Sequence, residues 1–275
     1  MLGGVIPSVR SLSTPPLMIT SFRRFALSVA TACLMMFTGN AAIAQSVDEL
    51  LKKGEVFDQR LEAGKALKYY LEAEKLDPKN VRILVRIARQ YRHLMVDTKS
   101  KEEKLRLGRM ALDYSLPAAA LAPMDPEAQL AVAITYGKML PLLGTKEQVE
   151  ASPRIKAAVD KTLRLDPRND TAWHILGRWH RSLAEIGSVK RALAGAIYGR
   201  LPLGSNEEAA TALEKAVVLN PNRLMHYIEL GRVFLQMGRI DDARRTLKKG
   251  LAMPDMEKDD PETKQRGREA LAKLR

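Results

Sequence analysis

The chain has 275 residues, with 45 Lys and Arg against 32 Asp and Glu, and a formal net charge of +13. Its one cysteine, Cys33, excludes an intrachain disulfide framework. Aromatic residues are only 5% of the chain and the cations are spread along it, so we expect no nucleic acid partner.

The first 46 residues differ sharply from the rest, because they contain three arginines and no acidic residue. Read from Met18 as the start, they show a basic pair, an apolar run over residues 25–37 and the small residues AIA just before Gln45. This order is typical of a secretory signal with a cleavage site. We predict a targeting segment over residues 1–44 and an exported mature chain, located in a bacterial periplasm or envelope.

The same leader admits other interpretations. Counted from Met1, its serines and arginines resemble a mitochondrial presequence, and residues 25–44 are apolar enough to remain as a membrane anchor. A location in the cytoplasm or at the cytoskeleton is the third alternative. A lipid-modified Cys33 is disfavoured, because Ala30 stands where such a site expects leucine.

Four proline-containing strings divide the rest of the chain at intervals of roughly forty to fifty residues, somewhat longer than one helical repeat. They read LDPKN at 76–80, MDPE at 124–127, LDPRN at 165–169 and LNPNR at 219–223. Proline cannot continue a helix, and the Asp or Asn before it satisfies backbone groups left free at a helix end. Each string therefore marks the boundary between two helical hairpins.

Bulky and small residues alternate at helical spacing after each string. After the fourth, the first helix carries Tyr227, Leu230, Gly231 and Phe234, and the second carries Ala243. This resembles the tetratricopeptide unit, a helix–turn–helix of about 34 residues whose small residues let its two helices approach. We predict an all-α, tetratricopeptide-like solenoid over residues 46–275, with about five helical hairpins, several inserts and a polar capping helix near residues 260–274.

The unequal spacing of the strings indicates extra residues between the two helices of a unit, at 97–103, 140–153 and 186–206. The longest of these inserts reads IGSVKRALAGAIYGRLPLGSN. It places Val189, Leu193, Ile197 and Leu201 on one side of a short amphipathic helix. We interpret this helix as a structural brace across the solenoid; a contact with a partner or a membrane is the alternative.

Residues 165–250 carry a more specific resemblance. The string WHILGRW at 173–179, the step LAE at 183–185, the basic and apolar insert ending at Ser205, and the exit at Asn220 follow one another in this order. In this order the chain resembles the regulator of microtubule dynamics family, over about residues 50–275. The resemblance implies an all-helical adaptor associated with microtubules and, in some branches, anchored in a membrane. It implies no catalytic residue.

The sequence shows no enzyme motif. His93, His174, His180 and His226 lie in different units, and none forms the i, i+4 pair with a nearby acid that a zinc helix requires. A G-x-S-x-G string, a phosphate-binding glycine loop and a cysteine nucleophile are all absent from it. We predict a non-enzymatic protein without a cofactor or metal, with His180 in the core or the groove.

Five arginines fall on the positions of the first helix that face the concave side of such a solenoid. Counting the bulky residue as position four, Arg89, Arg178 and Arg232 share position nine, and Arg92 and Arg181 share position twelve. Stacked hairpins would align these side chains along the groove. Guanidinium groups bind carboxylate or phosphate there through paired hydrogen bonds.

Charge favours an acidic partner, because removal of the leader's three arginines leaves 42 Lys and Arg against 32 Asp and Glu, or +10. Our first hypothesis is a scaffold whose groove holds an acidic or C-terminal carboxylate segment of another protein, such as a tail of tubulin in a eukaryotic cytosol. The second is a lipid-contacting or tethering module that lays residues 186–206 on an anionic membrane. Pairing of each arginine with a neighbouring acid, as Arg181 with Glu185 at i+4, would leave no groove site.

Overall fold

The computed structural model describes residues 1, 3–4, 45–198 and 202–274, and omits the side chains of residues 188–190, 193 and 198. It divides into two units, Met1–Asp48 and Glu49–Arg275. The expected leader, with Met18 and Cys33, falls almost entirely outside the described residues. None of the helices described is both long enough and apolar enough to cross a membrane.

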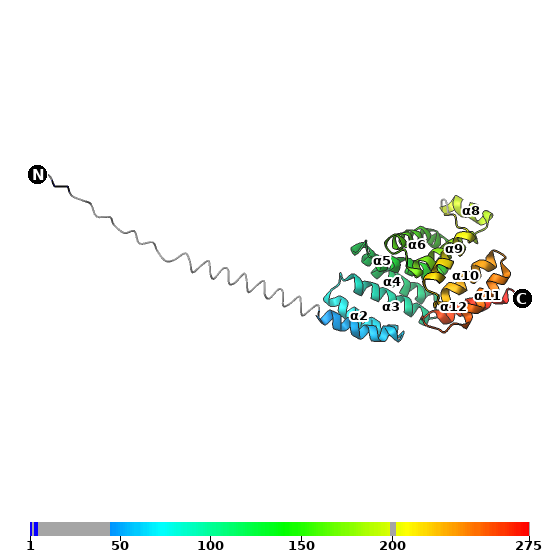
Figure 1. Ribbon diagram of the computed structural model, residues 1–275, viewed down its shortest axis with the longest axis horizontal. Coiled ribbons are helices and arrows are strands. Elements are labelled where there is room, and N and C mark those ends of the chain that lie inside the picture. Colours follow the sequence, from blue (N-terminus) through cyan, green and yellow to red (C-terminus); the bar gives the residue numbers. More distant parts are fainter. Residues whose placement is uncertain (2, 5–44, 199–201, 275) are drawn as a thin grey trace. The chain divides into compact units, whose positions relative to one another are not determined.

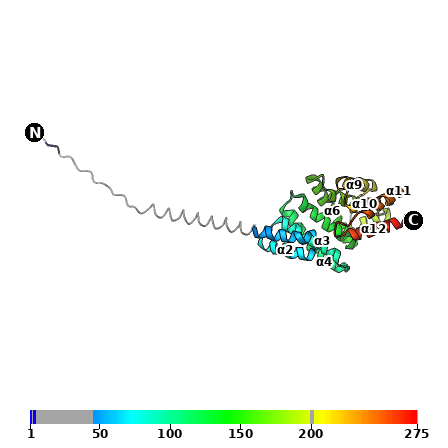
Figure 2. The ribbon, with the colours of Figure 1, turned by 60° about the horizontal axis from the view of Figure 1, so that its bottom comes forward.

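The second unit contains helices and no strand in its described part, residues 49–198 and 202–274. Figure 1 shows that helices close in sequence are also close in space, and Figure 2 shows the same stack from another side. After helical residues 49–59, the elements are α2 (Ala63–Leu76), α3 (Val81–Asp97), α4 (Lys101–Leu121), α5 (Pro126–Met139), η1 (Leu140–Leu142), α6 (Thr145–Leu165), α7 (Asp170–Ala184), α8 (Ser188–Tyr198), α9 (Asn206–Leu219), α10 (Leu224–Gln236), α11 (Ile240–Ala252) and α12 (Asp260–Ala272).

The helices pair into five hairpins in the described part of the chain: residues 49–59 with α2, α3 with α4, α5 with α6, α7 with α9, and α10 with α11. The last helix, α12, packs on α10 and α11 and covers the end of the stack. These contacts confirm the predicted tetratricopeptide-like solenoid with a capping helix.

Three of the four proline strings begin the next hairpin with a side-chain cap, in two different ways, whereas α10 after the fourth string begins at Leu224 without a side-chain cap hydrogen bond from Arg223. In the first string, the Asn80 side chain caps α3 by accepting from its backbone N–H groups, and it donates to Asp77 at 3.0 Å. Residues 166–169 repeat this arrangement before α7. In the second string Asp125 itself caps α5, and Pro126 occupies the first turn, where its missing N–H costs no hydrogen bond.

Two glycines of the repeat pattern allow the paired helices to approach. A Cβ at Gly177 would lie 2.5 Å from Cγ of Leu213 on α9, and a Cβ at Gly231 would lie 2.6 Å from Cγ of Leu247 on α11. Real carbon atoms do not pack so closely, so any larger residue must push the second helix away. The glycines therefore serve helix packing, as the sequence pattern predicts.

The extra residues of the second and third units mostly lengthen the second helix instead of forming inserts, so this part of the expectation is wrong. Helix α4 begins at Lys101, where Ser100 caps it, and α6 begins at Thr145; each is 21 residues long. Pro153, the predicted end of an insert, lies inside α6. The helix continues on both sides of Pro153, although proline locally disfavours a helix interior.

The long insert of the fourth unit does form a helix, α8, as predicted. Arg191 on α8 donates to the carbonyl oxygens of Leu183 and Pro202, the latter at 2.7 Å, so the base of the insert is fixed to the end of α7. In Figure 1 α8 projects from the stack instead of lying across it as a brace. Ile197 is 61% exposed; the Val189 and Leu193 side chains and Leu201 fall outside the described part.

Candidate functional site

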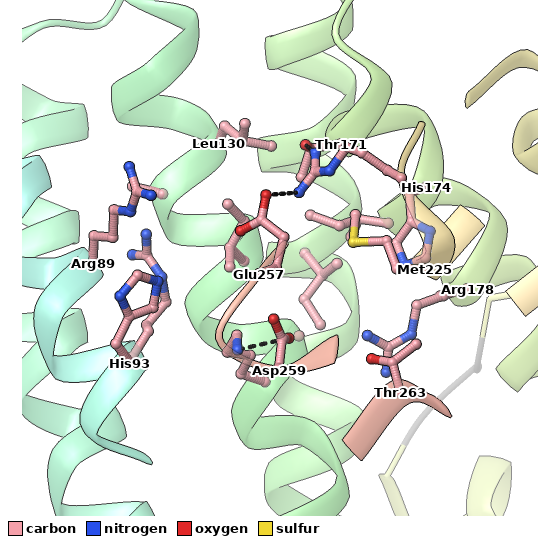
Figure 3. A pocket seen from close by; sticks show the side chains of 18 of the residues that line it. Arg89, His93, Leu130, Thr171, His174, Arg178, Met225, Glu257, Asp259 and Thr263 are labelled. Atoms are coloured by element: carbon pink, nitrogen blue, oxygen red, sulfur yellow. Dashed lines mark hydrogen bonds and ion pairs between the residues drawn. The ribbon is translucent and has the colours of Figure 1, made fainter. Parts of the chain in front are cut away.

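The first helices of successive hairpins line a common cavity of about 470 Å³. Its walls are residues 55–59, α3, α5, α7 and α10, and α12 with the segment before it closes one side. Figure 3 shows cationic and histidine side chains of α3 on one side, those of α7 on the other, and two carboxylates between them. The cavity therefore forms where the inward positions of neighbouring units meet.

The α3 side presents three guanidinium groups, those of Arg86, Arg89 and Arg92. Arg89 is half exposed, and its Nε lies 3.7 Å from Oδ1 of the buried Asp58. Arg92 is buried and donates to Thr135 Oγ1 at 3.2 Å; burial lowers its pKa to about 10, so it remains a cation at neutral pH. Burial, and then the charge of Arg89, lower the pKa of His93 to about 3, which keeps that ring neutral.

The α7 side is organised by one buried acid, Glu229 of α10. Arg181 Nε donates to its Oε1 at 2.6 Å, and Arg232 Nη1 donates to its Oε2 at 2.9 Å. Burial alone would raise the pKa of Glu229, but Arg178, Arg181 and Arg232 hold it far below its usual range. Arg181 also pairs with Glu185 at 3.1 Å, the pair that the helical spacing predicts.

Arg178 differs from its two neighbours. It lines the cavity and experiences the charge of Glu229, yet it forms no hydrogen bond or ion pair with any residue that the structure describes. Burial lowers the pKa of Arg178. A guanidinium has five N–H donors, and half-buried Arg178 faces the cavity, so this side chain can receive an anionic group from outside.

A chain of polar contacts joins α7 to α10 behind the cavity. Arg223 donates to Asp170 Oδ2 at 2.9 Å, and Nε2 of the buried His226 lies 2.9 Å from the same oxygen. Nδ1 of His226 lies 3.2 Å from Nδ1 of His174. Burial lowers the pKa of both histidines, so with neutral rings His226 donates to Asp170 and accepts from His174. These polar contacts fix Arg223 at the cavity rim.

Two carboxylates inside the cavity belong to the segment that joins α11 to α12. Glu257 Oε1 accepts from Arg223 Nη2 at 3.2 Å, and Asp259 Oδ2 accepts from Lys138 Nζ at 2.9 Å (Figure 3). Burial alone would raise the pKa of Asp259, but Lys138 lowers it to about 2, so the carboxylate is charged at neutral pH.

The five arginines that the sequence assigns to the groove therefore take different places. Arg89, Arg92 and Arg178 line the cavity. Arg181 and Arg232 are not among the lining residues and are bound to Glu229. The structure thus brings three of the five to one surface and uses the other two to hold a buried acid.

Sequence reasoning missed the other charged residues of the cavity. Lys138 occupies position thirteen of its helix, an inward position in the count that selects the arginines, so extending the count to lysine would have found it. Glu257 and Asp259 were detectable as part of the acidic run DMEKDD at residues 255–260 in a domain that is otherwise basic.

Stacked hairpins around an inner, charged cavity define a tetratricopeptide-type α-solenoid. A thermophilic tetratricopeptide protein of Thermus thermophilus shares this fold, with a TM-score of 0.58, 18% identity and coverage of 82% of this chain and 99% of that one. PilF of Pseudomonas aeruginosa is similar with a TM-score of 0.50, 14% identity and coverage of 85% and 90%.

The chain belongs to the regulator of microtubule dynamics family: the family model described as "Regulator of microtubule dynamics protein 1-3" matches residues 43–275. Regulator of microtubule dynamics protein 1 of Mus musculus is 26% identical over 83% of this chain and 75% of its own length. The protein 1 of Caenorhabditis elegans is 26% identical over 59% of this chain and 72% of its own length. Protein 3 of Bos taurus is 23% identical over 81% of this chain and 48% of its own length.

Proposed function

We propose that this chain is a non-enzymatic scaffold that holds an acidic or carboxylate-bearing segment of a partner protein against the arginines of its inner cavity. The family and the tetratricopeptide-type fold support a role as a protein-interaction scaffold. One observation supports the choice of ligand. Arg178 lines the cavity with no hydrogen bond or ion pair to a described residue, while Arg181 and Arg232 beside it are bound to Glu229.

A carboxylate placed at Arg178 gains charge-assisted hydrogen bonds that no residue in the described part of the chain forms with this guanidinium. Such bonds contribute about 1.5–3 kcal/mol each, so charge reversal at Arg178 should weaken binding by roughly ten- to a hundredfold. Arg89 lies on the opposite side of the cavity in Figure 3, so a segment with several carboxylates can contact both sides.

Fluorescence anisotropy of the full chain with a fluorescein-labelled octaglutamate peptide tests the proposal. Octaglutamine is the neutral control peptide. Arg178→Glu should lose at least tenfold in affinity, whereas Arg164→Glu, the same charge change at an exposed position of α6 outside the cavity, should lose much less. Equal losses in the two variants would show that net charge, and not the cavity, attracts the peptide.

The names of the relatives suggest one source of the acidic segment. In a eukaryotic cytosol, the acidic tails of tubulin have the required chemistry, and we include them in the proposal. Cosedimentation of the full chain with microtubules before and after proteolytic removal of the tails tests this source. Binding that persists unchanged without the tails would exclude them as the ligand.

A second candidate function is contact with a lipid membrane. The observation that favours it is the exposure of apolar side chains on the insert, 61% for Ile197 and 71% for Leu203. Cosedimentation with phosphatidylserine vesicles separates the two functions. Loss of vesicle binding in Ile197→Asp, with no effect of Arg178→Glu, would favour the membrane module.

The compartment is a separate part of the proposal. We propose that the leader directs export and is cleaved before Gln45, with retention as an anchor or import into an organelle as alternatives. Mass spectrometry of the mature N-terminus decides between them. Gln45 as the first residue supports export, and a retained leader contradicts it.

A further inference from the structure

We propose that the acidic segment of this chain, residues 253–259, occupies the partner-binding face of the cavity, and that a partner's carboxylates displace Glu257 and Asp259 when they bind. This inference rests on the proposed function, because it names the surface and the kind of partner that fits it. That partner is an acidic protein segment with closely spaced carboxylates. It would take over Arg223 and Lys138 in addition to Arg178, which has no hydrogen-bond or ion-pair partner among the described residues.

The acidic segment makes contacts of the kind that such a partner would make. Its two inward carboxylates receive hydrogen bonds from Arg223 and Lys138, which belong to different repeat units. Between them, Lys258 points the other way, and its Nζ lies 2.8 Å from Oδ1 of Asp97 at the end of α3. A short stretch of chain thus contacts three separate hairpins, as a bound peptide in a solenoid groove would.

Charge balance indicates the same role. The lining of the cavity includes seven Arg and Lys side chains and six Asp and Glu side chains. Two of the six acids, Glu257 and Asp259, come from the acidic segment. Without these two, the surface that remains is cationic, so an acidic partner restores the balance that the segment provides in the free chain.

The contacts of the acidic segment are placed where a partner can compete with them. The side chains of Glu257 and Asp259 are 37% and 34% exposed, and those of Arg223 and Lys138 are each 23% exposed. Ion pairs with this much solvent access are screened by salt, and an incoming carboxylate can reach their donors. By contrast, Arg181 and Glu229 are almost fully buried, so their pair stays in place during an exchange at the rim.

One buried carboxylate holds the displaceable residues in position. Asp260, at the start of α12, accepts hydrogen bonds from the backbone N–H groups of Met256 and Glu257 at 2.8 and 2.7 Å. Displacement of the segment must break these two bonds. The two amides therefore report, by hydrogen exchange, whether the segment has left the cavity.

The decisive variant is Glu257→Gln with Asp259→Asn in the full chain, titrated with the same octaglutamate peptide. Removal of the internal competitor should tighten binding by at least about threefold, because a larger fraction of the protein is then open to ligand. The matched control, Glu214→Gln with Glu269→Gln, removes two exposed charges that do not line the cavity. Binding of the first variant no tighter than that of the control overturns the inference.

Hydrogen exchange of the unmodified chain provides a measurement that does not depend on a variant. Saturating octaglutamate should speed exchange at the amides of Met256 and Glu257 while the peptide protects the cavity. Unchanged exchange there in a saturated complex overturns the inference. If octaglutamate binds neither the native chain nor the double variant, the proposed function is refuted as well. If octaglutamate binds and Arg178→Glu abolishes that binding, the proposed function stands and only the displacement of the acidic segment is refuted.

Discussion

Glu229 is the buried centre of the α7 side of the cavity, and its replacement by glutamine should destabilise the fold strongly. Its side chain is 4% exposed, and that of Arg181, its partner at 2.6 Å, is 10% exposed. Removal of one charge from a buried pair costs about 3–5 kcal/mol when the other charge stays buried without compensation, and Arg181 keeps only the exposed Glu185 as a second partner. Glutamine keeps one acceptor oxygen, so we expect the low end, about 3 kcal/mol of free energy of unfolding.

Urea unfolding followed by circular dichroism at pH 7 measures this loss. A double-mutant cycle with Arg181→Met isolates the pair, since Glu229→Gln should cost clearly less once Arg181 is neutral. Glu214→Gln, on the exposed face of α9, serves as the control and should change stability by less than about 0.5 kcal/mol. A loss below about 1 kcal/mol, or an equal loss in both backgrounds, would refute the view that Glu229 holds these arginines.

Three further predictions follow from burial and packing. Burial lowers the pKa of His93 to about 3, so the unfolded chain binds a proton at this ring before the folded chain does as the pH falls below about 6.5. Between pH 8 and pH 5, the free energy of unfolding of the unmodified chain should therefore fall about 2 kcal/mol more than that of His93→Gln. Equal pH dependence of the two proteins in unfolding titrations would contradict this. Gly231→Ala should lower the thermal midpoint, since a Cβ there meets α11, whereas Gly137→Ala, with open space in α5, should not. Trp179→Phe should lower the free energy of unfolding in urea by about 1–3 kcal/mol, because it removes the buried hydrogen bond that Trp179 Nε1 donates to Ser152 Oγ at 3.0 Å. The same substitution in a Ser152→Ala background should lower it by less.

The repeat pattern predicts most of the fold, because residues close in sequence determine where each first helix begins and which of its positions face inward. Proline after Asp or Asn, and glycine at the helix contact, have local steric consequences that hold in the folded chain. The lengths of α4 and α6 were missed for the opposite reason. Pro153 is a local signal for a break, and packing of α6 against its neighbours overrides it.

The inward positions of the arginines were also predictable, but their partners were not. The i+4 contact of Arg181 with Glu185 follows from helical geometry. Its stronger contact with Glu229 joins residues 48 positions apart, and only the stacking of hairpins brings them together. The return of residues 257–259 to the cavity depends on the path of the chain after α11, which no helical period encodes.

The position of a bound acidic peptide on the surface of the full chain tests whether the cavity is the binding site. An octaglutamate peptide that carries one benzophenone side chain can be photo-crosslinked, and mass spectrometry can then identify the attached residues. We expect adducts on residues that line the cavity, such as Leu130 and Met225 in Figure 3, and their loss in Arg178→Glu. Adducts confined to α8 or to the outer face of α9, unaffected by Arg178→Glu, would contradict this.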